Sequence, residues 1–393
     1  MKKVLEGVKV VDFSLAASAP LCSKMLQEYG AKVIVVESLT GSTTRFGAPH
    51  SFDFFAGGKR NISVNLKAPD GIEIMRKLIS KADVFQSNFR AKALKKLGLS
   101  YEDVKKLNPG CVYAVVDGFG NKGPAKDDPG YDVISFWARG GLQRDMSPKG
   151  TLMPSPVTVG DSVTSIVLTM GVCAALYHKA MTGEGSYVSA SLLSAAMFIN
   201  NDCFIESQYG DVYPRAHNTS RRALMNTYKC KDGEWVSILT VSFERDFNNI
   251  LKAVGRADLI GDPRWQCVED TMYDKAPELI AILDEAFSKM TRDEAIERLR
   301  PVDIGLNAVQ STMDTITDPQ VEANKFVVQY TTLEGKKLYV PTPPCRIGED
   351  YEPVEQELGP KLGQDTKAIL KEYGYTDEQI AKLLADKVVR SAE

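Results

Sequence analysis

The sequence has few of the side chains that bind transition metals, since its 393 residues include only three histidines, His50, His178 and His217. These histidines do not stand at metal-ligand spacing, and none lies beside a cysteine or carboxylate in a triad-like pattern. The seven cysteines are scattered along the chain and form no CxxC pair. We therefore expect no bound metal, and reduced thiols in a cytosolic protein.

Three common nucleotide and hydrolase motifs are also missing. The first turn between a predicted strand and helix, "FSLAASAP", lacks GxGxxG, which weighs against a nicotinamide dehydrogenase. No P-loop and no GxSxG elbow occurs, which weighs against ATP chemistry and serine hydrolysis. We expect no nucleotide cofactor.

An excess of positive charge is absent, because the formal net charge is -3 and the lysines and arginines are spread along the chain. This distribution argues against nucleic acid or an anionic membrane as a partner. The apolar run in "MKKVLEGVKVVDF" is too short for a signal peptide, and no apolar segment is expected to span a bilayer. The predicted location is the cytoplasm.

Strand and helix patterns alternate over the first 120 residues. The predicted strands are Val8–Phe13, Lys32–Glu37, Asp83–Ser87 and Cys111–Val116, with helices at Pro20–Tyr29 and Ala68–Lys81 between them. This alternation predicts an α/β fold with a Rossmann-like parallel sheet. The length predicts a second domain. It begins near Leu224 with a hairpin, "LMNTYKCKDGEWVSILTV", and continues with helices at 243–254, 277–289 and 292–299.

Polar and small residues follow the predicted parallel strands, at the edge of the sheet where such folds bind ligands. These strand ends are 12–14, Glu37 with Ser38, 88–90 and 118–120. Arg90 is placed there to pair with a phosphate. The turn "GGKRN", with Lys59 and Arg60, is a second and weaker basic candidate.

One acid, Asp161, stands at the start of an apolar stretch that predicts a helix to about Lys179. Two interpretations remain open from these residues alone. Asp161 is a cap for the free N–H groups of the helix. Alternatively, it is a nucleophile, which the positive end of the helix dipole at a buried N-terminus would hold ionised and aimed.

The ordered motifs of the chain resemble the family III CoA-transferases, the formyl-CoA and carnitine CoA-transferase group. The similarity begins with "LEGVKVVDFS", "YGAKVIVVE", "GGKRNISVNLKAPDG" and "ADVFQSNFR". It continues through the 36 residues from Leu97 to Asp132, "VGDSVTSIVLTMGVCAALYHKAMTGEG" and "LGQDTKAILKEYGYTDEQIAKL". It extends from about residue 5 to 389.

The resemblance implies roles for particular residues. Asp161 falls on the catalytic aspartate, which accepts the acyl group of an acyl-CoA as a mixed anhydride. Arg90 falls on an arginine that contacts the CoA phosphates, and Ala16 and Ala17 fall near the thioester. The other expected contacts to coenzyme A, which serves as substrate, are Glu37, Lys59, Arg60, Gly118, Phe119, Gly120 and Tyr131.

The resemblance also implies the domain organisation. It predicts a large CoA-binding domain over 1–200, a linker over 201–224, a small α+β domain over 225–325, and a return segment over 326–393 that completes the large domain. Two chains are expected to form an interlocked homodimer.

Two departures from the family bear on the activity. The glycine-rich loop of formyl-CoA transferase is replaced by "HNTSRRALMNTY", with Arg221 and Arg222, which favours an acid larger than formate or oxalate, such as a 2-hydroxy acid, a carnitine-like betaine or a steroid acid. The α-methylacyl-CoA racemases of the same fold carry a histidine where this chain has Tyr131, so a racemase is the weaker alternative. A non-catalytic acyl-CoA-binding protein is another.

Overall fold

The computed structural model describes residues 3–148, 150–349 and 351–392, and its contacts divide the chain into two compact units. The first unit comprises 1–145, 154–208 and 319–393, and the second comprises 146–153 and 209–318. Residues 209–224, where a linker is predicted, thus group with the second unit. The chain leaves the first unit twice and returns to it.

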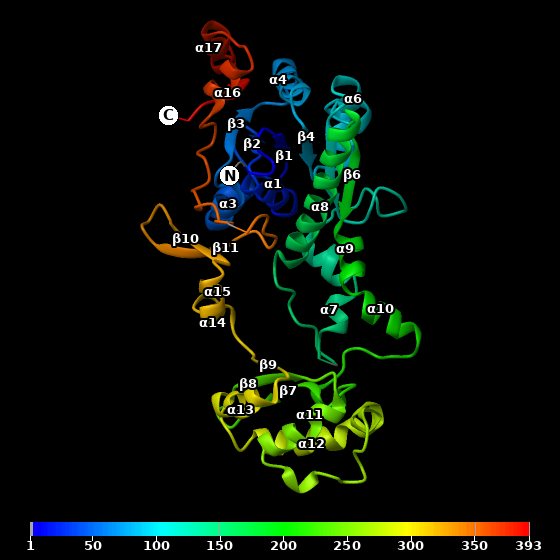
Figure 1. Cartoon of the computed structure of the whole chain (residues 1–393). Coiled ribbons are helices and arrows are strands. Elements are labelled where there is room, and N and C mark those ends of the chain that lie inside the picture. Colours follow the sequence, from blue (N-terminus) through cyan, green and yellow to red (C-terminus); the bar gives the residue numbers. More distant parts are fainter. Residues whose placement is uncertain (1–2, 149, 350, 393) are drawn as a thin grey trace. The chain divides into compact units, whose positions relative to one another are not determined.

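The first unit is built on a seven-stranded sheet with the strand order β12-β3-β2-β1-β4-β5-β6 (Figure 1). All neighbours are parallel except β12, which pairs antiparallel with β3. The strands are β1 Lys9–Phe13, β2 Lys32–Glu37, β3 Arg60–Val64, β4 Val84–Ser87, β5 Val112–Asp117, β6 Tyr187–Ser191 and β12 Val389–Arg390. The order reverses between β1 and β4, the point at which open α/β sheets bind ligands.

The predicted α/β sheet is confirmed for β1, β2, β4 and β5, whose apolar runs are continuous because both faces of the sheet are covered. Alternate residues of each strand enter different cores: Val10 packs on one side and Val11 on the other. The prediction missed β3 and β6. Their buried positions include Asn61 and Ser63 in β3 and Ser191 in β6, so they lack the apolar signal.

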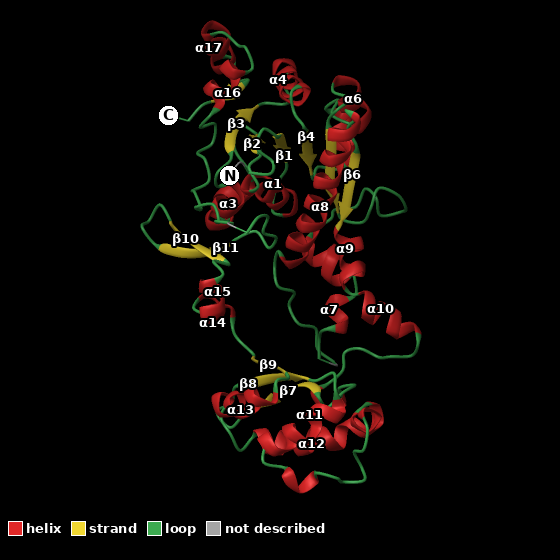
Figure 2. Ribbon diagram, in the orientation of Figure 1, coloured by secondary structure: helices red, strands yellow, loops and turns green. Residues whose placement is uncertain are grey.

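Helices cover both faces of this sheet (Figures 1 and 2). One core contains residues of α1 and α8, and the other contains residues of α4, α6, α16 and α17. The helices of the first unit are α1 Ser18–Glu28, α2 Thr43–Gly47, α3 Pro49–Ala56, α4 Pro69–Ser80, α5 Ala91–Lys96, α6 Tyr101–Leu107, α7 Leu142–Asp145, α8 Val159–Thr182, α9 Leu192–Ile199, α10 Asn201–Gln208, α15 Pro319–Ala323, α16 Thr366–Glu372 and α17 Asp377–Ala385, together with the π-helix Asp132–Ala138.

Helix α8 corrects one expectation of the sequence analysis. Its 24 residues are long and apolar enough to cross a membrane by length and composition alone. It packs against α1, β5 and β6 through a face of small and medium side chains that includes Thr164, Leu168 and Val172. Larger side chains, among them Ile166 and Met170, are exposed in the single chain. The stretch is therefore apolar nearly all round, but only one side is buried in this unit.

The return segment completes the first unit. It forms the hairpin β10 Val327–Thr331 and β11 Lys337–Pro341, and then α16, α17 and β12. Thr376 caps α17 in a capping box with Gln379, as its sequence predicts. Ile369 of α16 and Ile380 of α17 enter the core beside the sheet.

The second unit is a three-stranded antiparallel sheet with helices packed on it. The predicted hairpin is confirmed as β7 Met225–Lys229 and β8 Trp235–Leu239, and β9 Gly305–Ala308 pairs with β8. Gly233 in the turn has a φ of 86°, a left-handed conformation that favours glycine. The helices are α11 Phe243–Ala253, α12 Ala276–Phe287, α13 Arg292–Leu299 and α14 Thr312–Ile316, and short 3-10 turns lie at 217–219, 257–259, 268–271, 273–275 and 300–302.

Candidate active site

A cavity of about 830 Å³ lies at the carboxyl edge of the large sheet, beside the point where the strand order reverses. It is lined by residues that follow β1, β4 and β5, among them Ala16, Arg90 and Gly118, and by Asp161 in the first turn of α8. The structure thus brings together residues that are far apart in the sequence. The predicted meeting holds for the ends of β4 and β5 and for the loop after β1, whereas Glu37 at the end of β2 lines a separate small pocket.

Asp161 does not cap its own helix. The N-cap position of α8 is Thr158, whose φ is 70° and whose side chain makes no capping hydrogen bond. The backbone N–H of Asp161 instead donates to Oδ2 of Asp132, at 3.0 Å. Asp132 begins the π-helix 29 residues earlier in the chain and is buried. Of the two interpretations, the one in which Asp161 caps this helix is therefore wrong, and the Asp161 carboxylate lines the cavity.

Burial and, to a lesser extent, the negative charge of Asp132 together raise the pKa of Asp161 to about 6, and a hydrogen bond from Ser18 opposes both effects. Burial and Asp132 therefore outweigh the helix dipole, which was expected to favour the charged form. A carboxyl group with this pKa is ionised in most molecules at pH 7.5. It is then a more basic carboxylate than an exposed aspartate, and it is only partly hydrated.

The loop between β1 and α1 borders Asp161 in the cavity. Ala16 has a φ of 60°, a left-handed conformation that is unfavourable for a residue with a Cβ. Leu15, the residue before Ala16, is held by two hydrogen bonds to Asn88, which follows β4. The Leu15 N–H donates to Asn88 Oδ1 at 2.9 Å, and Asn88 Nδ2 donates to the Leu15 carbonyl at 2.6 Å. The loop is thereby fixed to the neighbouring strand end.

Cationic side chains line the same cavity. Arg90 has no ion-pair partner within the described part of the chain, and Lys95 and Lys126 join it in the lining. The sequence analysis missed these lysines, because an isolated lysine gives no signal that separates a cavity from the surface. These cations can bind a phosphate-bearing ligand.

An aromatic wall was also missed. Tyr101, Tyr113 and Tyr187 line the cavity, and their ring centroids are 5.2–5.8 Å apart. They come from α6 and from the first residues of β5 and β6. Their side chains add apolar and polar contact surface to the cavity.

A family model described as CoA-transferase family III matches residues 5–366. The chain belongs to this family. Its similarity to (R)-2-hydroxy-4-methylpentanoate CoA-transferase of Clostridioides difficile is 36% identity over 98% of this chain and 100% of that protein. It is 32% identical to cinnamoyl-CoA:phenyllactate CoA-transferase of Clostridium sporogenes, over 98% and 97% of the two chains. The protein is thus a CoA-transferase, and coenzyme A thioesters are its substrates.

Two more distant relatives match the chain over nearly its whole length. Formyl-CoA:oxalate CoA-transferase of Escherichia coli O157:H7 is 29% identical over 98% of this chain and 99% of that one. The solved structure of a CAIB/BAIF family protein from Brucella suis is 25% identical, with a TM-score of 0.80 over 95% of this chain and 100% of that one. The α/β fold with a large parallel-sheet domain is confirmed.

The residues predicted to contact coenzyme A fall into three groups in this transferase. Those that line the large cavity, with Asp161, are Ala16, Arg90, Gly118, Gly120 and Tyr131. Those that line a separate small pocket of about 30 Å³ are Ala16, Glu37 and Lys59. Those that line neither are Ala17, Arg60 and Phe119.

The last group has protein partners instead. Ala17 is buried against Leu21 and Phe55. Arg60 Nη1 pairs with Glu372 Oε2 at 2.6 Å, and the ring of Phe119 lies 4.9 Å from the Arg139 guanidinium. The structure therefore does not bring these three side chains into the cavity.

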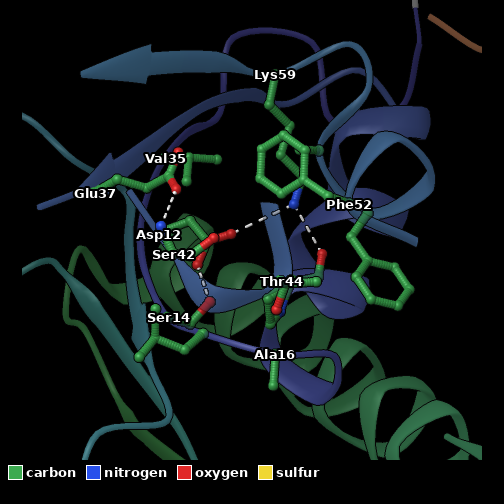
Figure 3. Close-up of a pocket in the computed structure, with 13 residues that line it drawn as sticks. Asp12, Ser14, Ala16, Val35, Glu37, Ser42, Thr44, Phe52 and Lys59 are labelled. Atoms are coloured by element: carbon green, nitrogen blue, oxygen red, sulfur yellow. Dashed lines mark hydrogen bonds and ion pairs between the residues drawn. The ribbon is translucent and has the colours of Figure 1, made fainter. Parts of the chain in front are cut away.

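Lys59 projects toward Asp12 inside the small pocket (Figure 3). Its Nζ lies 3.4 Å from Asp12 Oδ2 and donates to the Pro20 carbonyl at 2.8 Å and to Ser23 Oγ at 2.6 Å. Burial lowers the pKa of Lys59 to about 8, and the charge of Asp12 opposes that shift. Lys59 thus ties β3 to β1 and α1 beneath the loop that carries Ala16.

Glu37 is also engaged by the protein. Its carboxylate accepts hydrogen bonds from the Arg45 guanidinium, from the Ser42 N–H at 2.9 Å and from Asn61 Nδ2 at 2.6 Å. These contacts hold the segment after β2 to β3. Among the described residues, no group of three or more His, Cys, Asp or Glu side chains is placed to hold a metal ion.

Proposed function

We propose that Asp161 is the acyl acceptor of this CoA-transferase, and that the reaction moves coenzyme A from an acyl-CoA to a free carboxylic acid. The observation that carries this proposal is the carboxylate of Asp161 in the cavity, where it is free of a capping role because Asp132 accepts the Asp161 N–H that an N-cap side chain would otherwise accept. A partly desolvated carboxylate, rigidly held, suits nucleophilic attack.

The proposed steps conserve atoms and charge. An oxygen of Asp161 attacks the thioester carbonyl, the C–S bond breaks, and coenzyme A leaves as a thiolate while an aspartyl mixed anhydride forms. The thiolate then attacks the aspartyl carbonyl, which releases the donor acid and leaves an aspartyl-CoA thioester. The acceptor carboxylate attacks that thioester, the C–S bond breaks, and a second anhydride forms as the coenzyme A thiolate leaves. The thiolate then attacks the acyl carbonyl of the acceptor, which forms the new acyl-CoA and releases the Asp161 carboxylate. Exchange of one acid for another needs no ATP.

We propose a 2-hydroxy acid with an apolar side chain as the acceptor. The named substrates of the two relatives at 36% and 32% identity, 2-hydroxy-4-methylpentanoate and phenyllactate, support this class. Leu15 adds an apolar side chain to the cavity beside Asp161. Arg221, which the sequence offers in place of the glycine-rich loop, bonds to Tyr273 in the second unit.

The acceptor class is tested with a panel of acids and one acyl-CoA donor. We expect 2-hydroxy-4-methylpentanoate and phenyllactate to be converted into their CoA thioesters with kcat/KM at least about 10-fold above that for oxalate, since one or two apolar contacts are worth that factor. A preference for oxalate with formyl-CoA would overturn the assignment. Deuterium uptake at C2 of an acyl-CoA without acid exchange would instead support a racemase.

Arg90 is proposed to bind the phosphates of coenzyme A. Replacing Arg90 by Ala should raise KM for the acyl-CoA by about 10- to 100-fold with little change in kcat, because a charge-assisted contact is lost in both ground and transition states. Arg76→Ala, in the exposed part of α4, is the matched control and should leave KM unchanged. A normal KM in the Arg90 variant would remove this residue from the binding site.

We also propose that two chains assemble as interlocked partners. The support is the resemblance to the family together with exposed large apolar side chains on α8, α9 and α10, including Ile166, Met170, Phe198 and Phe204. Light scattering should give twice the chain mass of 43.2 kDa. A stable, active monomer would contradict the assembly.

A further inference from the structure

The carboxylate of Asp132 acts on Asp161 in two ways, through a hydrogen bond to the Asp161 backbone N–H and through its negative charge. Asp132 is 5% exposed, and its Oδ2 accepts the Asp161 N–H at 3.0 Å. Burial raises the pKa of Asp132, and hydrogen bonds from the Asp161 and Gly160 N–H groups partly oppose that rise. The first turn of α8, which has no side-chain cap of its own, is therefore held by a carboxylate from another element.

The charge of Asp132 is not neutralised by an ion pair within the described residues. It faces Asp161 from the π-helix, while α1 contributes only the Ser18 hydroxyl to the electrostatic surroundings of Asp161. Two carboxylates that share a partly dry site oppose each other's ionisation. Asp132 thus makes the charged form of Asp161 less favourable while it fixes the backbone of that residue.

We infer that Asp132 is a positioning residue that holds the nucleophile in place and, by its negative charge, raises the lower pH limit of the transfer. This inference rests on the proposed role of Asp161. A carboxylate that is harder to ionise is also more nucleophilic once it is ionised. Asp132 therefore lowers the activity at low pH and makes the ionised Asp161 more reactive at higher pH.

The direction of the pH dependence follows from the requirement that Asp161 must be ionised to attack. Because its pKa is raised to about 6, the rate falls as the pH drops through that value and is fully present above it. Removing the charge of Asp132 leaves the burial of Asp161 unchanged but removes the second largest cause of the shift.

The test compares the pH profiles of kcat/KM for Asp132→Asn, Asp132→Glu and wild type, with 2-hydroxy-4-methylpentanoyl-CoA as donor and phenyllactate as acceptor. Asn retains an oxygen that can accept the Asp161 N–H, so Asp132→Asn should remain active while its acid limb moves down by roughly 0.5–1 pH unit. Asp132→Glu keeps the charge and should keep the wild-type limb.

A matched control separates this effect from loss of stability. Asp246 is also a buried aspartate in the first turn of a helix, α11 of the second unit, and Asp246→Asn should leave the acid limb in place. An unmoved limb in a folded Asp132→Asn enzyme refutes the inference. If Asp132→Asn fails to fold, a limb displaced in Asp132→Glu refutes it instead.

The proposed function fails in a different way from this inference. If Asp161→Asn retains full transfer activity, Asp161 is not the nucleophile, whatever the profile of the Asp132 variants. If Asp161→Asn is inactive and the Asp132→Asn limb stays at the wild-type pH, only the role of Asp132 is wrong.

Discussion

Replacing Asp161 by Asn should lower kcat for CoA transfer by about 10⁴-fold or more, the size of loss seen when an enzyme loses its covalent nucleophile. The amide cannot form the mixed anhydride, while its backbone N–H still reaches Asp132 Oδ2, 3.0 Å away in the wild type. Steady-state transfer assays at pH 7.5 measure the loss. Binding of acyl-CoA should persist, since the cations that line the cavity are unchanged.

The same variant carries its own control for folding. The pKa of Asp161 is raised to about 6 in the folded protein, above its ordinary value of 3.8, so folding penalises the ionised form. That cost is present above about pH 6 and disappears below about pH 4. Asp161→Asn should therefore melt at or above the wild-type temperature at pH 7–8. A variant that is inactive and also strongly destabilised would contradict the account, because its inactivity would have another cause.

Lys59→Met should destabilise the first unit by about 3–5 kcal/mol, because it leaves Asp12 buried without its cation. Asp12 is 1% exposed, and its remaining partners are the hydroxyls of Ser14 and Ser23. Hydrogen exchange of β1 and α1 measures the change in this unit directly. The double variant Asp12→Asn with Lys59→Met removes both charges and should recover part of the loss.

The buried cluster of Lys59, Asp12, Ser14 and Ser23 also supports the loop that borders the candidate site. Ala16 and Lys59 line the same small pocket, and the Ser14 hydroxyl, two residues before the strained Ala16, donates to Asp12. Loosening the Lys59 cluster should therefore also weaken catalysis. A loss of less than about 1 kcal/mol in Lys59→Met, with normal exchange in β1, would mean that the pair contributes little, as exposed pairs do.

The parts of the fold that were predictable are those with a strong apolar pattern. The runs in β1, β2, β4 and β5 and the capping box at Thr376 each carry a local signal that the structure follows. β3 carries no such signal, because its buried residues Asn61 and Ser63 are polar. Asn61 Oδ1 accepts from the Gly363 N–H, and the Ser63 N–H donates to Thr366 Oγ1, both more than 300 positions away. Contacts with residues distant in the sequence stabilise such a strand, and these contacts leave no pattern in the local sequence.

The candidate site divides in the same way. Asp161 and Arg90 were found because a helix start and a strand end are local features, and the structure places both at one cavity. Asp132 was missed because its partner is a backbone N–H 29 residues away. Lys59 was found but for a different reason: its basic turn suggested a ligand contact, whereas the ammonium group bonds to Asp12, Pro20 and Ser23.

The covalent role of Asp161 is tested most directly by trapping. The wild-type enzyme is incubated with 2-hydroxy-4-methylpentanoyl-CoA, quenched with hydroxylamine and digested, and the peptide that contains Asp161 is analysed by mass spectrometry. An activated aspartyl carbonyl reacts with hydroxylamine, so Asp161 should carry a hydroxamate in the presence of the acyl-CoA and none without it. Active enzyme that shows no modification at Asp161, or a hydroxamate at another acid, would contradict the mechanism.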